Sequence, residues 1–552
     1  MFPEGLKSIG AEAFSDCENL RTVTLPEGLT FIGEDAFDNC WNLTAVTLPN
    51  SLIVWDSNPF ARTRLKTISV SDDHPAFVVM DQVLYSKDAS KLLCYPYGKN
   101  EKELVVPNGV RVIGKKAFVV DNPVTAVTLP EGLTAIEDEA FAWCYDLADI
   151  TLPEGVTFLG KKCFFACGQL VSVTLPDSLT NLDWNPFVGC FKLSKIRVSE
   201  NHPAFTVKDQ VLYSKDGSEL LCYPAGKKGK KFTVPQGVRV IENAAFSETP
   251  LTDITLSKEL TSIGDSAFAN CEKLSDITWP KGLASIGDGA FEWCEGLTGI
   301  TFPEGLVSIG DRAFCWCSGL ASVAFPEGLK SIGNEAFLGC FNLDEIRFSN
   351  GLETIGEMAF AECENLSAVA LPEGLSSLGR QAFSGCGNLV NVLFSEGLTS
   401  IEKFAFYRCT SLASITFPKG LTSIGAGAFL GCESLASLTL PDGLKSIGDI
   451  AFQGCVSLSS ITFPEGMDSI GNKAFYFCPA LSSLTLPEGL KSIGALAFSD
   501  CGSLTSVTLP DSLTSVEFWV FDESQDLILS VSKDSYGEKY AIEYGLNYIY
   551  RE

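Results

Sequence analysis

Residues 412–432 read LASITFPKGLTSIGAGAFLGC, and this pattern recurs along almost the whole chain. Its phenylalanine, Phe429, has counterparts at a spacing of 23 residues nearly throughout, with one step of 22 and two long steps. A fixed period of this length is typical of a solenoid, in which each repeat forms one coil and buries its apolar side chains against its neighbours. The twenty repeat phenylalanines are Phe14, Phe37, Phe60, Phe118, Phe141, Phe164, Phe187, Phe246, Phe268, Phe291, Phe314, Phe337, Phe360, Phe383, Phe406, Phe429, Phe452, Phe475, Phe498 and Phe521.

Each repeat predicts two short strands followed by a tight turn. Residues 412–417 alternate in polarity and include a β-branched residue, as a half-buried strand does. Pro418 ends this strand because it has no N–H to continue a ladder, and residues 421–424 predict a second short strand. Residues 428–432 have room for about one helical or 3-10 turn, with Phe and Cys on the same side. We therefore expect a repeat protein of about 20–22 coils, each with two strands and one helical or 3-10 turn.

The full pattern, x-L-P-x-G-L-x-x-I-G-x-x-A-F-x-x-C-x-x-L-x-x-V, strongly resembles that of the BspA-like leucine-rich-repeat proteins, a family of mostly bacterial surface proteins. The resemblance implies a right-handed, curved leucine-rich-repeat solenoid. It also implies an exported protein, from a family often linked to adhesion or to recognition of host proteins. It supplies no site residues, because the shared motif is the core itself and a repeat scaffold carries many different functions.

The two long steps in the phenylalanine series contain the same extra module, at about residues 71–107 and 199–235. The two modules share much of their sequence at a constant offset. In the second module, Asp216-Gly217 lies between two apolar runs, which is a strong hairpin signal. Each module is therefore interpreted as one additional coil with a projecting hairpin.

The repeat pattern stops after Phe521, which sets the predicted domain boundary. We interpret residues 1–526 as a single solenoid and residues 527–552 as a carboxy-terminal cap that shields the last coil. The chain begins with residues that look like the middle of a repeat, so we expect it to start inside one, and it shows neither an export signal nor an anchor. The cap is expected to contain a strand over 527–531, a short helix over 535–544 and a closing strand over 546–550.

Charge and hydropathy narrow the possible partners. The 552 residues carry a net charge of −28, with 46 % hydrophobic and 20 % charged residues. This negative charge repels nucleic acids and anionic membranes. No apolar run approaches the ~18 residues of a membrane-spanning helix. Together with the family resemblance, these properties predict a monomeric extracellular or cell-surface protein that binds no nucleic acid and does not insert into a membrane.

Sixteen of the twenty cysteines stand three residues after a repeat phenylalanine, once per coil. A cysteine that recurs with the period of the core is most simply a small buried residue. Disulfide bonds along this cysteine column need converging Cβ vectors, whereas stacked side chains run parallel, so we expect free thiols. Cys315 lies outside the column, and we expect it to be exposed and reactive. The sequence contains no C-x-x-C pair, so nothing indicates a zinc site.

Nothing in the sequence indicates an active site. The only two histidines, His74 and His202, each precede a proline at matched places in the two modules, which favours a turn role over metal binding or acid–base chemistry. The recurring Pro-Glu-Gly turns offer isolated carboxylates rather than the six or more oxygens that Ca²⁺ prefers. No nucleophile is paired with a base. We therefore expect no enzyme activity, no cofactor and no metal site.

Large aromatic residues at solvent-facing repeat positions are the candidate ligand contacts. Trp143, Trp293 and Trp316 each stand two residues after a repeat phenylalanine, where most coils have Asp, Asn, Glu or Gly. Exposed aromatic side chains anchor many protein and sugar contacts, and packing against the next coil is the equally good alternative for these residues. Because Trp293 and Trp316 share one repeat phase, they are predicted to lie about 5 Å apart on adjacent coils. There they would form a flat apolar platform flanked by Glu292 and Glu295.

Two other surfaces compete with the tryptophans. The hairpins near Tyr85 and Tyr213 are expected to project from a rigid scaffold, where function is often found. A threonine also follows the strand valine or isoleucine in thirteen coils and predicts an outward ladder. Such ladders on flat solenoids order ice or repetitive glycans, although β-propensity at a polar outward position explains the pattern more simply.

These features predict a non-catalytic recognition or adhesion protein whose ligand is a protein, such as a host extracellular or surface protein, or a glycan. The alternative is a structural spacer or stalk that has no ligand of its own. Saturable binding to a defined ligand separates the two.

Overall fold

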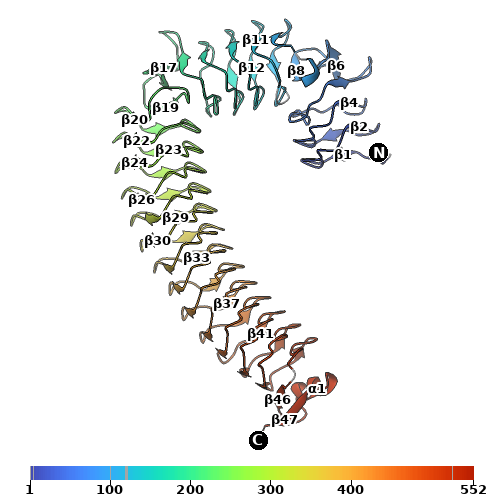
Figure 1. Cartoon of the computed structure of the whole chain (residues 1–552), viewed down its shortest axis with the longest axis vertical. Coiled ribbons are helices and arrows are strands. Elements are labelled where there is room, and N and C mark those ends of the chain that lie inside the picture. The colour runs from blue at the N-terminus through green and yellow to red at the C-terminus, as the bar shows by residue number, and fades with distance from the viewer. Residues whose placement is uncertain (1, 4, 100, 119–121, 525, 552) are drawn as a thin grey trace. The chain divides into compact units, whose positions relative to one another are not determined.

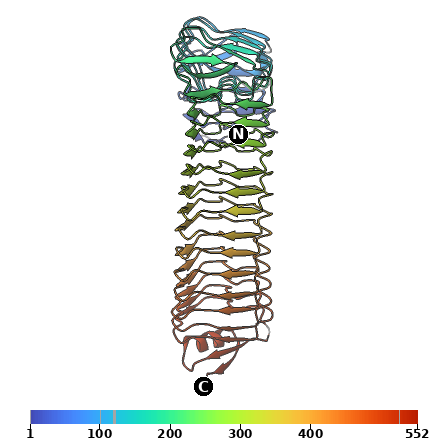
Figure 2. The same ribbon diagram turned by 90° about the vertical axis from the view of Figure 1, so that its left-hand side faces the viewer.

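The chain folds into coils of β-strands that contain almost no helix (Figures 1 and 2). Over the residues that the computed structural model describes, the coils form a parallel β-solenoid of about 23 turns, which confirms the predicted repeat fold. The described residues are 2–3, 5–99, 101–118, 122–524 and 526–551. The chain divides into two compact units: unit 1 is Met1–Leu251 with Ile263–Cys271, and unit 2 is Thr252–Ser262 with Glu272–Glu552.

The first strand of each coil has three residues and pairs in parallel with the first strand of a neighbouring coil. In unit 1 these strands are β2 (Thr22–Thr24), β4 (Ala45–Thr47), β5 (Thr67–Ser69), β9 (Glu103–Val105), β11 (Ala126–Thr128), β13 (Asp149–Thr151), β15 (Ser172–Thr174), β16 (Lys195–Arg197) and β20 (Lys231–Thr233). In unit 2 they are β22 (Asp253–Thr255), β24 (Asp276–Thr278), β26 (Gly299–Thr301), β28 (Ser322–Ala324), β30 (Glu345–Arg347), β32 (Ala368–Ala370), β34 (Asn391–Leu393), β36 (Ser414–Thr416), β38 (Ser437–Thr439), β40 (Ser460–Thr462), β42 (Ser483–Thr485) and β44 (Ser506–Thr508).

The second strand of each coil has two residues, usually Ser-Ile. The second strands within residues 1–251 are β1 (Ser8–Ile9), β3 (Phe31–Ile32), β10 (Val112–Ile113), β12 (Ala135–Ile136), β14 (Phe158–Leu159) and β21 (Val240–Ile241). The later ones are β23 (Ser262–Ile263), β25 (Ser285–Ile286), β27 (Ser308–Ile309), β29 (Ser331–Ile332), β31 (Thr354–Ile355), β33 (Ser377–Leu378), β35 (Ser400–Ile401), β37 (Ser423–Ile424), β39 (Ser446–Ile447), β41 (Ser469–Ile470), β43 (Ser492–Ile493) and β45 (Ser515–Val516).

The register of these strands follows the sequence period. In unit 2, Leu438 is opposite Ile461 and Thr439 is opposite Thr462 in the β38–β40 pair. The strand centre Leu438 is buried, whereas Thr439 is exposed, so the threonines form the expected outward ladder. A shift of one residue would exchange the buried and exposed faces, which is why the period is held so strictly.

The core of each coil is built around the repeat phenylalanine. Phe360 is fully buried, and its ring lies 5.2 Å from Phe337 and 5.4 Å from Phe383, measured between ring centroids, with nearly parallel planes. Leucine, isoleucine, alanine and cysteine at fixed repeat positions surround this stack. One coil cannot cover these side chains, so the two neighbouring coils do.

The column cysteines have a second role that their spacing did not reveal. The thiol of Cys409 donates a hydrogen bond to the carbonyl of Phe383 in the preceding coil, with a sulfur–oxygen distance of 3.2 Å. The same contact recurs from Cys432 to Phe406 and in most other coils. Nineteen of the twenty cysteines are buried free thiols, and Cys17 is the exposed one. The expectation for Cys315 was wrong, because its side chain is fully buried.

The predicted helical turn after the second strand is absent. Instead, the N–H groups of Ala428, Leu430 and Cys432 each donate to the carbonyl three residues earlier, closing three overlapping tight turns. The third residue of the first and of the last turn has a positive φ, 63° at Gly427 and 75° at Gly431. Alternate N–H groups of this segment, for example that of Phe429, donate to the next coil rather than along their own coil. Because these donors are used between coils, no helix can form.

Each extra module forms a three-stranded antiparallel meander, one hairpin more than expected. The additional turn is Asp209-Gln210, where both residues have positive φ. The third strand of the first meander pairs in parallel with β10, so it replaces the second strand of its coil. A 3-10 helix, η1 (Tyr97–Lys99), follows. The meander strands are β6 (Phe77–Met80), β7 (Val83–Ser86) and β8 (Lys91–Cys94) in the first module, and β17 (Phe205–Lys208), β18 (Val211–Ser214) and β19 (Glu219–Cys222) in the second.

A buried asparagine joins the coils on either side of each module. The Asn185 side chain donates to the carbonyl of Ala244 at 3.0 Å and accepts from the N–H of Phe187 at 3.0 Å. Asn58 makes the equivalent contacts with Lys116 and Phe60. The turn segments of these coils therefore touch directly, although the module lies between them in the sequence. Around the first module the direction of stacking changes within unit 1 (Figure 1).

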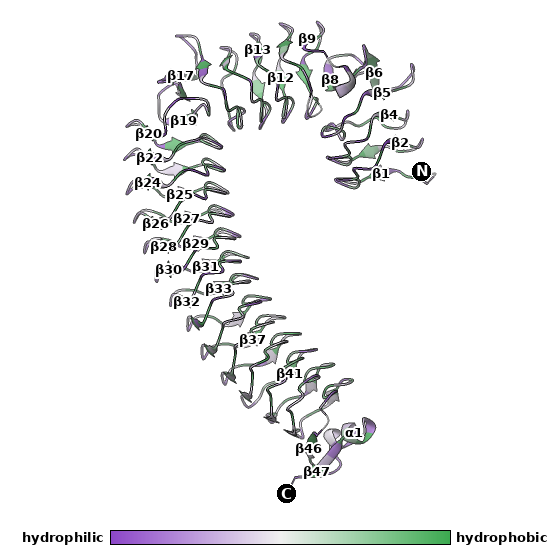
Figure 3. Ribbon diagram, in the orientation of Figure 1, coloured by the Kyte–Doolittle hydropathy of each residue, from purple (hydrophilic) through white to green (hydrophobic). Residues whose placement is uncertain are grey.

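The carboxy-terminal cap contains the expected strand, helix and strand. These are β46 (Ile528–Val531), α1 (Tyr536–Glu543) and β47 (Asn547–Tyr550), and β46 pairs in parallel with both β44 and β47. Ser535 caps the helix by accepting from the N–H of Glu538. Tyr540 stands edge-on to Phe521, with ring centroids 6.3 Å apart. β47 contains hydrophilic and hydrophobic residues (Figure 3), and its Ile549 and Tyr550 side chains are more than half exposed.

Candidate ligand-binding surface

The second residue after the repeat phenylalanine, here called the Phe+2 position, has a left-handed backbone in most coils. At Trp143, Trp293 and Trp316 the φ angles are 64°, 60° and 59°. Glycine occupies the same position in several other coils, such as Gly339 and Gly385. A bulky side chain in this conformation costs about 1–2 kcal/mol. The three tryptophans are therefore held at positions that glycine or asparagine would occupy with less strain.

Trp293 and Trp316 lie together on adjacent coils of unit 2, as their spacing predicts. Their ring centroids are 5.2 Å apart and their planes differ by 10°. The row continues to Phe341, whose ring centroid is 5.5 Å from that of Trp316. Trp293 is 39 % exposed, and Trp316 and Phe341 are half-buried. We call these three residues the aromatic row.

The aromatic row is not the flat platform that we expected. The two indoles stack face to face, so each covers one face of the other, and the row presents ring edges to solvent. The second face of Trp316 lies over Gly339, where an added Cβ would come within 2.4 Å of the indole. Trp316 also packs on Cys315, Leu338 and the other members of a small cluster at the turn edge. Gly339 therefore makes room for the indole.

Charges beside the row are arranged differently from the sequence expectation. Glu292 is half-buried and accepts a hydrogen bond from Arg312 at 2.5 Å, and Arg312 also binds Glu335 at 2.7 Å. The Glu292 hydrogen bond is the largest contribution that raises the pKa of Arg312 above its usual value. Glu292 is thus paired within the protein, and Glu295 is the exposed carboxylate on this side.

Trp143 lies in unit 1, so it contributes to a separate surface. Its indole stands edge-on to Phe165, with ring centroids 4.6 Å apart, and lies 6.0 Å from Tyr145. The side chain is half-buried, whereas Tyr145 is 43 % exposed. Trp143 therefore contacts mainly its own and the next coil.

Tyr85 and Tyr213 do not project from the hairpins. Their side chains are 3 % and 2 % exposed, because both lie on the inward face of the middle meander strand. Burial raises the pKa of Tyr85 to about 12. The expectation that these residues provide a competing ligand surface is therefore corrected: both belong to the core.

The two histidines are structural in the same way. His74 and His202 are fully buried, and each Nε2 lies 3.0 Å from a proline carbonyl of an adjacent coil. Each Nδ1 accepts from two backbone N–H groups, among them that of Phe77 beside His74. Both nitrogens of each ring are thus engaged with the backbone, so a structural role accounts for the two histidines at matched places in the modules.

Among the described residues, no cluster of three or more His, Cys, Asp or Glu side chains could hold a metal ion. The helices found there are also too short and too polar to cross a membrane.

Comparison with known proteins identifies the family. The family described as "BspA type Leucine rich repeat region" matches in 6 copies, over residues 1–77, 94–212, 223–343, 284–412 and 399–528. The chain therefore belongs to the BspA-type leucine-rich-repeat family, as its repeat motif predicted. This family fits a non-catalytic repeat protein.

Several solved structures are similar to the chain. One is a leucine-rich repeat protein from Eubacterium ventriosum, with 24 % identity and a TM-score of 0.48, covering 56 % of this chain and 94 % of that one. Another, from Bacteroides ovatus, has 22 % identity and a TM-score of 0.44, covering 86 % and 98 %. A leucine rich cell surface protein from Faecalibacterium prausnitzii has 26 % identity and a TM-score of 0.37, covering 62 % and 83 %. No curated protein matches the chain at a significant level.

Proposed function

We propose that this chain is a non-catalytic recognition protein, exposed outside the cell, whose aromatic row binds a protein or glycan ligand. The observation that carries the proposal is the conformation of Trp293 and Trp316. Both occupy left-handed positions where large side chains are unfavourable, yet they stack into one partly exposed row. Strain that the surrounding structure maintains is typical of functional positions.

The surroundings of the row support the same proposal. The row stands on a rigid turn edge whose N–H groups are hydrogen-bonded to the next coil, for example from Trp293 to Cys315 at 2.9 Å. Preformed aromatic edges reduce the entropy cost of binding, because little side-chain freedom is left to lose. Aromatic side chains of this kind carry much of the binding energy at protein and sugar interfaces.

The direct test compares the chain with a variant in which the row is removed without strain. Trp293→Gly and Trp316→Asn install residues that tolerate a positive φ, which offsets part of the packing lost with the indoles, so the chain should stay folded while ligand binding is lost. Binding is measured on a glycan array and against a panel of purified extracellular matrix proteins. Phe477→Gly is the matched control, since Phe477 is also at a Phe+2 position, with φ 59° and 50 % exposure, outside the row.

Three results are informative. Saturable binding that the double variant loses and the control keeps supports the proposal. Equal binding by all three proteins moves the ligand site away from the row. No binding by the wild-type chain across both panels favours the structural spacer.

A further inference from the structure

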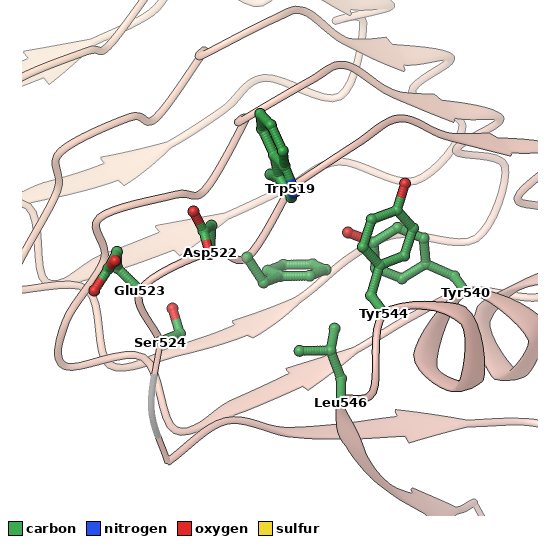
Figure 4. A pocket seen from close by; sticks show the side chains of 8 residues that line it. Trp519, Asp522, Glu523, Ser524, Tyr540, Tyr544 and Leu546 are labelled. Atoms are coloured by element: carbon green, nitrogen blue, oxygen red, sulfur yellow. The ribbon is translucent and has the colours of Figure 1, made fainter.

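A pocket lies at the end of unit 2, between the last coil and the cap helix α1 (Figure 4). Its volume is about 430 Å³, within the usual range for ligand sites. Phe521 and Tyr540 are its buried members, and Tyr544 stacks on Tyr540 with ring centroids 4.6 Å apart. Trp519, Asp522 and Glu523 also line the pocket.

The pocket exists because the turn segment of the last coil has no successor. In the preceding coil, the N–H groups of Leu496, Phe498 and Asp500 donate to carbonyls of the last coil at 2.9–3.2 Å. The corresponding donors of the last coil belong to Trp519, Phe521 and Glu523. Among the described residues these three N–H groups have no hydrogen-bond acceptor. They form a row of donors at alternate residues, as on the edge of a sheet.

The side chains around these donors favour a positively charged group. Asp522 and Glu523 are exposed carboxylates, and none of the eight described residues lining the pocket is cationic. Trp519 is 56 % exposed at the pocket edge, where its indole face can hold a cation. The net charge of −28 adds a long-range attraction for basic ligands.

We propose that this end of unit 2 binds an extended peptide that carries a basic side chain. Carbonyl groups at alternate residues of the peptide would accept from the N–H groups of Trp519, Phe521 and Glu523, as a further coil would. The basic side chain would enter between Trp519 and the carboxylates of Asp522 and Glu523. This mode is strand addition to an open edge, in which main-chain bonds give affinity and side-chain pockets give specificity. The site is separate from the aromatic row and does not depend on it.

The experiment uses the full chain with selectively ¹⁵N-labelled tryptophan. The eight tryptophans give few backbone amide signals, and the Trp519 signal is assigned with the Trp519→Phe variant. The probe is the capped pentapeptide Ac-Val-Lys-Val-Lys-Val-NH2, whose β-branched residues favour an extended backbone. We expect a saturable downfield shift of the Trp519 amide signal, no shift of the Trp293 signal, and weaker binding as salt is raised.

Matched variants test the charge and separate this site from the proposed function. Asp522→Asn with Glu523→Gln should weaken binding about fivefold, in line with exposed ion pairs. Glu517→Gln, an exposed acid of the same coil outside the pocket, should leave it unchanged. The Trp293→Gly, Trp316→Asn variant should bind the peptide normally, so failure of the row would not affect this result.

The outcomes that overturn the proposal are equally specific. Equal affinity for Ac-Val-Glu-Val-Glu-Val-NH2 would remove the charge argument. A Trp519 shift produced by methyl glucoside and not by the basic peptide would assign the pocket to sugars. A Trp519 signal that does not move with any of these probes would mean that the open donors are satisfied by water alone.

Discussion

Phe360 shows what a single side chain contributes to this fold. Its ring is fully buried and stacked between the rings of two neighbouring coils. The void left by its removal cannot be refilled, because the neighbouring rings are themselves fixed by their own coils. One residue therefore supports three coils.

Phe360→Ala should lower the free energy of unfolding by about 3–5 kcal/mol, the usual penalty for deleting a buried phenyl ring. Denaturant unfolding followed by circular dichroism measures this loss. Phe477→Ala, which truncates a ring that is 50 % exposed, is the control and should cost much less. A loss below about 1 kcal/mol at Phe360 would be incompatible with its place in the stack.

The thiols are expected to differ sharply in reactivity. Cys17 is exposed, whereas Cys315 is fully buried, and burial raises the pKa of Cys315 to about 12. Iodoacetamide at pH 8 should therefore label Cys17 in the native protein within minutes and leave Cys315 unmodified, because the thiolate is the reacting species. Peptide mass spectrometry after a labelling time course measures both rates. Comparable rates at the two sites would restore the original view of Cys315 as a surface thiol.

Among the elements of a coil, the two strands follow from sequence and the turn does not. The strict period leaves one register that keeps Leu438 inside and Thr439 outside. Residues 428–432 fit a helical turn equally well by spacing, but alternate N–H groups, those of Phe429 and Gly431, donate to the neighbouring coil. Hydrogen bonds between coils thus compete with those of a helical turn, and contacts between coils are not visible in the sequence of one repeat. The trace of this competition in the sequence is the frequency of Gly, Asn and Asp at the Phe+2 position, where φ is positive.

The candidate site was predictable to a similar depth. The shared phase of Trp293 and Trp316 predicted their contact, but it could not show that their faces stack, since that depends on Gly339 making room in the next coil. The sequence gives no sign of the first hairpin, because its turn Asp81-Gln82 lacks the usual glycine. Without that hairpin, nothing indicates that Tyr85 lies on the inward face of β7.

The buried asparagine beside each module connects the coils on either side of it, and its contribution to stability can be measured. Asn185→Ala leaves the buried N–H of Phe187 without its acceptor and takes from the Ala244 carbonyl one of its two hydrogen bonds, the other coming from Ser247. The unsatisfied N–H should cost about 1–3 kcal/mol. Urea unfolding of unit 1 measures the loss, and hydrogen exchange should show it concentrated around residues 185–187 and 243–246. Asn181→Ala, an exposed asparagine nearby, serves as the control. Equal stability of both variants would show that the module is held by its strands alone.

At the scale of the whole molecule, the buried thiols couple stability to alkaline pH. Burial raises the pKa of Cys455 and Cys501 to about 12, from a usual value of 9.0, and burial also raises the pKa of Cys409 well above 9.0. The unfolded chain therefore ionises first. The protonated buried thiols therefore contribute their full stabilisation of the folded state below about pH 9. This contribution is lost as the pH rises towards the pKa of the thiols in the folded chain.

The free energy of unfolding of unit 2 should accordingly fall as the pH rises above 9, by about 1.4 kcal/mol per pH unit for each thiol that ionises on unfolding. Urea titrations between pH 8 and pH 10.5 give the slope. Cys409→Ala removes one thiol and should reduce this slope by the contribution of a single thiol. Stability that stays constant through this range would mean that the thiols ionise equally in both states.

The thiol hydrogen bonds between coils also make the opening rate of individual coils measurable. A column cysteine can react only when its coil opens and releases the carbonyl of the coil before it, as Cys409 must release Phe383. The rate at which a thiol reagent modifies each column cysteine therefore measures how often that coil opens. Because column cysteines occur in sixteen coils, a single labelling time course would give a profile of opening rates along much of the solenoid. Any ligand bound to one stretch of coils would appear in that profile as a local slowing, whatever the ligand is.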